Sequence, residues 1–114
     1  MAAGTLDFTI EQGATFNLLL NWKVNNINVN LTGYTARLQA RVDVEDTNTI
    51  LSLTTGAGIT LGGAAGTISI DQTAAQTTLL PAGNYVYDLE LIAGAGSVTR
   101  LVQGELNISA EVTR

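Results

Sequence analysis

Hydrophobic and polar residues alternate with a period of two along most of the chain. Near the N-terminus Leu6, Phe8 and Ile10 alternate with polar side chains, and the same alternation returns over residues 16–22. This pattern is typical of strands that face a core on one side and solvent on the other. A helical repeat is nearly absent. The pattern therefore predicts an all-β chain.

Glycine and asparagine divide the alternating segments into about seven to nine short strands, a spacing that favours an antiparallel β-sandwich or a small barrel. The expected strands cover residues 6–11, 16–22, 34–42, 49–54, two short pieces within 56–70, 84–92, 97–103 and 105–112. A turn at Asn25–Asn26 and a short extended piece over residues 27–32 separate the second strand from the third. The chain has 114 residues and no linker-like segment, so we expect one domain over residues 1–114.

Two segments interrupt the alternation. The acidic stretch "DVEDTN" over residues 43–48 is expected to be a loop. The stretch "DQTAAQTTLLPAG" is compatible with a single helical turn, which Asp71 caps at its start and which Pro81 and Gly83 end.

The charge balance changes which partners this β domain is expected to have. Lys and Arg number 5 against 10 Asp and Glu, for a formal net charge of −5. Nucleic-acid binding needs a basic surface, and a membrane span needs ~20 apolar residues, so we expect neither partner. The N-terminus also lacks the pattern of a signal peptide. Only 13% of residues are charged, which suits a surface that meets other proteins, although a plain solvated surface explains it equally well.

The chain is poor in reactive side chains. It contains no cysteine and no histidine, which excludes disulfides and thiolate metal sites and removes the commonest general base. The single lysine, Lys23, has no serine placed to pair with it. We therefore expect no catalytic residue, no cofactor and no small-molecule substrate.

Two groups of carboxylates are candidates for a cation site. Asp88 and Glu90 share one face of one strand, where they either bind a cation or pair with Arg37 or Arg100 on neighbouring strands. The second interpretation is favoured, because charge pairs across strands commonly complete a polar sheet face. The oxygen-rich stretch over residues 43–48 does not have the spacing of an EF-hand loop, and no metal site is assigned to it.

The stretch "PAGNYVYDLEL" predicts a structural role for its aromatic residues. A Tyr just after a turn can return its hydroxyl to the backbone of the preceding connection, as in the tyrosine corner of immunoglobulin-like domains. Here Gly83 would make the turn, Tyr85 would be the corner, and Tyr87 and Trp22 would fill the middle of the core. The alternatives are that both tyrosines are simply good strand formers, and that Trp22 is an exposed platform for a sugar.

The order of the motifs resembles a group of small structural proteins of tailed bacteriophages. The segments "DFTIEQGATFNLLLNW", "VNLTGYTARLQAR", "LPAGNYVYDLEL" and "VTRLVQGELNISAEVTR" are similar in order to the immunoglobulin-like N-terminal module of phage upper-baseplate proteins. The resemblance covers essentially the whole chain and implies an immunoglobulin-like β-sandwich without catalytic residues. Baseplate proteins of this kind continue after the module, whereas this sequence ends at "EVTR", so we expect a free-standing module.

This resemblance implies a non-enzymatic virion component of the tail, baseplate, fibre connector or head decoration, made in the host cytoplasm. It would contact other virion proteins and form a homo-oligomer. We expect the contacts in residues 2–11 and in the last strand, because strand-like termini can pair with a neighbour. The candidate contact residues are Leu6, Phe8, Ile10, Arg37, Arg41, Leu106 and Ile108. Arg37 and Arg41 fit a solvated face equally well, and the alternative function is a carbohydrate- or receptor-binding surface domain.

Overall fold

The structure, a computed structural model, describes residues 4–112 and is all-β apart from two short helical turns. The elements, in chain order, are β1 (Gly4–Thr5), β2 (Phe8–Glu11), β3 (Phe16–Asn21), β4 (Lys23–Val24), β5 (Ile27–Asn28), β6 (Thr35–Arg41), β7 (Leu51–Thr55), β8 (Gly58–Leu61), the 3-10 turn η1 (Gly63–Ala65), β9 (Thr67–Gln72), α1 (Ala74–Thr78), β10 (Gly83–Ile92) and β11 (Val98–Ser109). The all-β prediction is confirmed. In the described part no helix is long and apolar enough to cross a membrane.

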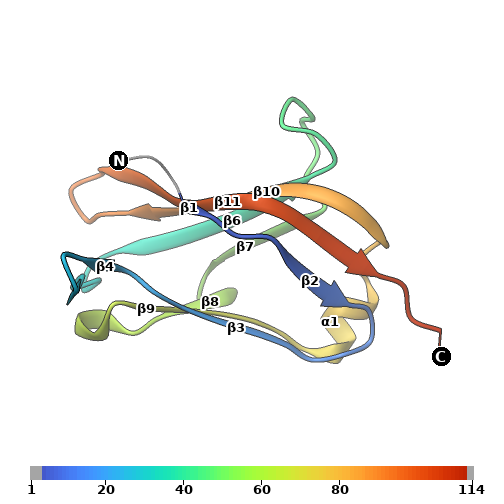
Figure 1. The fold of residues 1–114 in the computed structure, drawn as a ribbon, viewed down its shortest axis with the longest axis horizontal. Coiled ribbons are helices and arrows are strands. Elements are labelled where there is room, and N and C mark those ends of the chain that lie inside the picture. Colours follow the sequence, from blue (N-terminus) through green and yellow to red (C-terminus); the bar gives the residue numbers. More distant parts are fainter. Residues whose placement is uncertain (1–3, 113–114) are drawn as a thin grey trace.

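The main sheet follows the strand order β1-β11-β10-β6-β7-β8-β9-β3, with β2 also paired to β11. Figure 1 shows this path folded into two layers, with β11, β10, β6 and β7 facing β8, β9 and β3. β4 and β5 form a separate hairpin across Asn25 and Asn26, both of which have positive φ, as the predicted turn requires.

The sheet is mixed, which corrects the expectation of an antiparallel one. β1 and β2 both run parallel to β11, and β7 runs parallel to β8. The other pairings are antiparallel. Alternation determines which side chains face the core, but it carries no information about the direction of the neighbouring strand.

The core lies between the two layers and consists mainly of aliphatic side chains. β6 and β10 contribute the largest share, because every second residue of each strand points inward. The fully buried large residues are Ile10, Leu31, Leu38, Ile59, Ile68, Ile70, Leu89, Leu91, Leu106, Ile108 and Thr77. Removal of this apolar surface from water is the main stabilising contribution to the fold.

The last strand differs from its prediction. Two strands were expected, divided at Gly104, but β11 runs unbroken over twelve residues. Gly104 sits within the ladder, opposite Tyr87 of β10. A Cβ at position 104 would lie well inside 3.0 Å of the Leu6 carbonyl oxygen. The glycine is therefore required by close backbone approach and not by a turn.

The N-cap of α1 is also a different residue from the one predicted. Its N-cap is Thr73, whose hydroxyl accepts the amide of Gln76 at 3.2 Å while the Gln76 side chain accepts the Thr73 amide at 2.9 Å. This reciprocal pair is a capping box. Asp71, the predicted cap, lies in β9 and accepts a hydrogen bond from Ser69 at 2.9 Å. The helix starts two residues later than the sequence suggested because β9 extends through Gln72.

Candidate functional site

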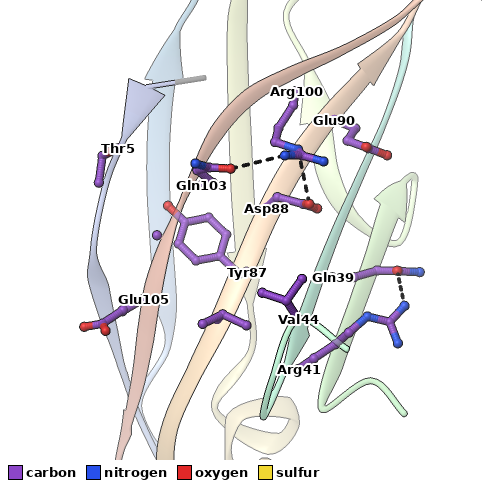
Figure 2. A pocket seen from close by; sticks show the side chains of 12 residues that line it. Thr5, Gln39, Arg41, Val44, Tyr87, Asp88, Glu90, Arg100, Gln103 and Glu105 are labelled. Atoms are coloured by element: carbon purple, nitrogen blue, oxygen red, sulfur yellow. Dashed lines mark hydrogen bonds and ion pairs between the residues drawn. The ribbon is translucent and has the colours of Figure 1, made fainter. Parts of the chain in front are cut away.

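A groove of about 530 Å³ lies on the outer face of β6, β10 and β11. Val44, from the loop after β6, and Thr5 of β1 also line the groove, and Figure 2 shows Thr5 at its left side. The outer-face residues that line it are Val86 and seven polar or charged residues, namely Gln39, Arg41, Asp88, Glu90, Arg100, Gln103 and Glu105. The groove was not predicted, because its wall depends on the path of the loop over residues 42–50.

The alternation of the strands places these side chains outside. Residues 36, 38 and 40 of β6 are buried, so residues 37, 39 and 41 point away from the core. In β10 the buried phase is Tyr85, Tyr87, Leu89 and Leu91, so Asp88 and Glu90 share the outer face. The ladder then sets Glu90 opposite both Arg37 and Arg100.

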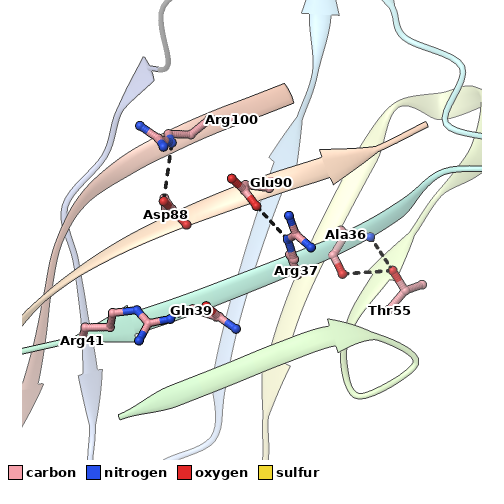
Figure 3. Close-up of polar contacts among 8 residues, drawn as sticks. All are labelled: Ala36, Arg37, Gln39, Arg41, Thr55, Asp88, Glu90 and Arg100. Carbon is pink, nitrogen blue, oxygen red and sulfur yellow. Dashed lines mark hydrogen bonds and ion pairs between the residues drawn. The ribbon is translucent and has the colours of Figure 1, made fainter. Parts of the chain in front are cut away.

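The predicted charge pairs across strands are confirmed (Figure 3). Arg37 Nε lies 2.7 Å from Glu90 Oε1, and Arg100 Nε lies 3.5 Å from Asp88 Oδ2. Arg41 donates to the Gln39 side chain and to the Asp46 carbonyl oxygen, each at 2.9 Å. Each of these arginines therefore has a partner within the domain, and the charges of Arg37 and Arg100 are balanced by carboxylates on β10.

The pKa of the Asp88 carboxyl is raised above its ordinary value. Partial burial is the larger cause and the neighbouring Glu90 carboxylate adds to it, whereas Arg100, Arg37 and Arg41 act in the opposite direction. A raised pKa is common at functional sites, but structural charge networks produce it too. Among the described residues, no three His, Cys, Asp or Glu side chains come together as they would to hold a metal ion. The groove therefore presents paired surface charges, and the described residues around it include no cluster of this kind.

Tyr85 makes the contact expected of a corner tyrosine. Its hydroxyl donates to the Pro81 carbonyl oxygen at 2.7 Å, and the Ala82 carbonyl oxygen lies 3.3 Å away. Gly83 is the first residue of β10, immediately after the connection and not within it. It has φ 150°, and a Cβ there would lie 3.1 Å from the Tyr85 hydroxyl. Glycine thus gives both the backbone conformation and the space that the Tyr85 ring needs.

Tyr87 connects β10 to the N-terminal strands. Its ring is buried and packs edge to face on Phe8, with centroids 4.8 Å apart. Its hydroxyl donates to the Leu6 carbonyl oxygen. Burial raises the pKa of Tyr87 to about 12, and the Asp7 carboxylate contributes to the rise. Asp7 in turn accepts the Glu105 amide at 2.9 Å, so the break between β1 and β2 is fixed from two sides.

Trp22 does not join Tyr87 in the middle of the core, which corrects that expectation. It follows the last residue of β3, is partly buried, and packs edge to face on Tyr34 with centroids 6.2 Å apart. The middle of the core is aliphatic instead. The alternation of residues 16–22 correctly predicted that the Trp22 side chain faces the core. It did not show that Trp22 lies at the end of β3, away from the middle of the core.

The candidate contact residues divide into two groups. Ile10, Leu106 and Ile108 are buried to 2% exposure or less, so their side chains belong to the core of this domain and are not free contact groups. β2 pairs with β11 in the same chain, bringing Phe8 opposite Leu106 and Ile10 opposite Ile108. Leu6 and Phe8 are partly buried, Arg37 is exposed and Arg41 is partly buried. Residues 2 and 3 of the predicted contact segment lie outside the described residues.

Comparisons with models of known protein families and with curated proteins found no match. Among solved structures, the chain is similar to the extracellular domain of the voltage-gated sodium channel beta4 subunit, described in parallel homodimers with a role in cell-cell adhesion (11% identity, 98% of this chain and 97% of that chain, TM-score 0.44). Another similar structure comes from a study of the cell-adhesive interactions of such beta subunits (11% identity, 99% and 98%, TM-score 0.46). A third is from extracellular domains 3–5 of Drosophila OTK (19% identity, 97% and 35%, TM-score 0.38). At these TM-scores the likenesses fix neither the strand topology nor the function.

Proposed function

We propose that the chain is a non-enzymatic structural protein of a tailed-bacteriophage virion, a component of its tail, baseplate, fibre connector or head decoration. It folds as an immunoglobulin-like β-sandwich and acts through protein–protein contacts in a symmetric assembly. Its partners are other virion proteins and further copies of itself. The observation that carries the proposal is the order of the sequence motifs, which resembles that of phage upper-baseplate modules over essentially the whole chain.

The contacts made by the motif residues support a scaffold role. In "GNYVYDLEL", the first tyrosine closes the corner at Pro81, and the second holds the N-terminal strands through Leu6. The two acidic residues pair with arginines on the adjacent strands. Every distinctive side chain of the motif is thus used within the fold. A protein that works by rigid shape has this property, whereas an enzyme keeps reactive groups free at a cleft.

Purified particles of the phage that encodes the chain provide the test. Antibodies raised against the purified domain should bind intact virions at a constant position in electron micrographs, and peptides of the chain should be found in density-gradient-purified particles. Particles from a strain in which the reading frame carries an early stop codon are the matched control. Absence of the chain from wild-type particles would refute the proposal.

A further inference from the structure

β3 forms one end of the strand path, and within residues 4–112 its one strand partner is β9. In an antiparallel ladder, residues alternate between those whose backbone groups face the partner strand and those whose groups face away. The Trp22 amide donates to the Gly66 carbonyl oxygen at 2.8 Å, so the even-numbered positions of β3 face β9. The amides and carbonyls of Asn17, Leu19 and Asn21 therefore point to the open edge of the sheet.

This edge lacks the features that normally prevent strand pairing, such as charges, proline, a bulge or short length. β3 keeps six residues in unbroken register with β9, and residues 16–22 contain neither a charge nor a proline. Leu19, near the centre, is 68% exposed. The opposite edge differs, because β1 and β2 have two and four residues and are interrupted at Leu6–Asp7. β3 is therefore the edge that is open to another strand.

We propose that β3 pairs antiparallel with β3 of a second copy of this chain, about a two-fold axis at Leu19. In this register Leu19 lies opposite Leu19 of the copy, and Asn17 lies opposite Asn21. These three residues carry the outward amides and carbonyls, so each residue exchanges both backbone hydrogen bonds with the residue opposite. The two main sheets then join into one continuous sheet.

The sequence of the edge favours a second copy as the occupant. In "FNLLLNW" the two-fold register places the side-chain amide of Asn17 opposite that of Asn21 and leucine opposite leucine. On the inner face it places Phe16 opposite Trp22. The whole chain carries a net charge of −5, so two copies repel each other over much of their surface. Residues 16–22 are uncharged and allow close approach. One strand edge buries less than the ~1,200 Å² of a standard interface, so we expect a dimer that depends on concentration.

The first test compares two leucine-to-lysine variants by sedimentation velocity over a wide range of concentrations. Leu19→Lys sets two ammonium groups directly opposite each other, so the dimer dissociation constant should rise by roughly tenfold or more. Leu79→Lys is the matched control, because Leu79 is 81% exposed at the end of α1 and lies outside β3. It should leave the dissociation constant unchanged. A monomeric wild-type chain at all concentrations, or a dimer that Leu19→Lys leaves intact, would overturn the proposal.

The second test uses the absence of cysteine from the chain, so that one introduced cysteine is the only thiol. Hydrogen-bonded residues in an antiparallel pair have Cα atoms about 5.5 Å apart, which suits a disulfide. Leu19→Cys should therefore cross-link to itself under mild oxidation, faster than Leu79→Cys. Asn17→Cys and Asn21→Cys should cross-link when mixed with each other and not when oxidised singly.

Equal rates for Leu19→Cys and Leu79→Cys would overturn the two-fold pairing. Rapid cross-linking of Asn17→Cys alone would also overturn it, because it would require a different register. Both tests use only the purified chain, and the inference does not depend on the proposed virion function. A negative result here therefore leaves incorporation into particles to be decided by the particle experiment.

Discussion

Tyr87 lies directly opposite Gly104 in the ladder of β10 and β11, and its hydroxyl donates to the carbonyl oxygen of Leu6. The same carbonyl group lies close to the Cα atom of Gly104. The absence of a side chain at position 104 lets the chain between β1 and β2 approach β11. The tyrosine hydroxyl then holds this segment in place. The parallel pairing of the N-terminal strands with β11 thus depends on one small residue and one phenol on adjacent strands.

Replacement of Gly104 by alanine should therefore destabilise the domain. The new Cβ would clash with the Leu6 carbonyl oxygen and the Asp7 side chain, and we expect a loss of about 1–3 kcal/mol in the free energy of unfolding, as for other overpacked sites. Gly4→Ala on the same edge is the control. Its Cβ would meet atoms no closer than 3.6 Å, and its effect should stay within about 0.5 kcal/mol. Urea unfolding followed by circular dichroism measures both, and equal effects would contradict this account.

The raised pKa of Tyr87 predicts a loss of stability at high pH. The unfolded chain releases this proton near pH 10.0 and the folded chain near pH 12. Between these values the unfolded state binds fewer protons, so the free energy of unfolding falls as pH rises, while below pH 10.0 the contribution is complete. Tyr87→Phe should be less stable than the wild type near neutral pH, by about 0.5–1.5 kcal/mol for the lost hydrogen bond.

The difference between Tyr87→Phe and the wild type should shrink between pH 10 and 12, because phenylalanine has no proton to release. Urea titrations at several pH values give the two curves, and absorbance at alkaline pH follows the tyrosines directly. Tyr85→Phe, which removes a hydroxyl from the same face of β10, is the control. Parallel curves for Tyr87→Phe and wild type would show that Tyr87 does not titrate in this range.

The sequence could predict the features that depend on alternation and on local turn chemistry. Period-two alternation gave the strands, and the spacing of Asp88 and Glu90 gave their pairing with Arg37 and Arg100. The position of Tyr85 after a Pro–Ala–Gly connection gave its hydrogen bond to Pro81. Each of these inferences needs only the side of a strand or a separation of a few residues.

Features that depend on distant backbone approach could not be predicted. Gly104 looks like a strand break until Leu6, nearly a hundred residues earlier in the chain, is placed against it. The direction of β2 relative to β11 is likewise absent from alternation, because both directions bury the same side chains. The groove depends on the path of the loop that carries Val44, which the acidic composition of that loop does not specify.

Gly83 and Tyr85 should be energetically coupled. Gly83→Ala introduces a Cβ 3.1 Å from the Tyr85 hydroxyl at a residue with φ 150°, and should cost about 1–3 kcal/mol of stability. Tyr85→Phe alone should cost about 0.5–1.5 kcal/mol through loss of the bond to Pro81. In the double variant the contact with the hydroxyl is gone, so the combined cost should be smaller than the sum of the two. A double-mutant cycle by urea unfolding measures this coupling, and strict additivity would count against it.

Asp88 should cost the domain stability when it is ionised. Its pKa is raised above the ordinary value of 3.8, chiefly by burial, so the folded state holds its proton to a higher pH than the unfolded state does. The free energy of unfolding therefore falls as pH rises through the window just above 3.8, and this loss persists at neutral pH.

Asp88→Asn removes the charge, keeps the shape and gives up the 3.5 Å ion pair with Arg100. Because the Asp88 side chain is 39% exposed, the gain at pH 7 should be small, roughly a few tenths of a kcal/mol, and it should vanish below pH 3.8. Glu90→Gln, which breaks the shorter pair with Arg37, is the control and should not stabilise the domain at pH 7. If Asp88→Asn is less stable than the wild type at pH 7, the ion pair with Arg100 stabilises the fold by more than burial of the Asp88 carboxylate costs. That outcome would contradict this prediction.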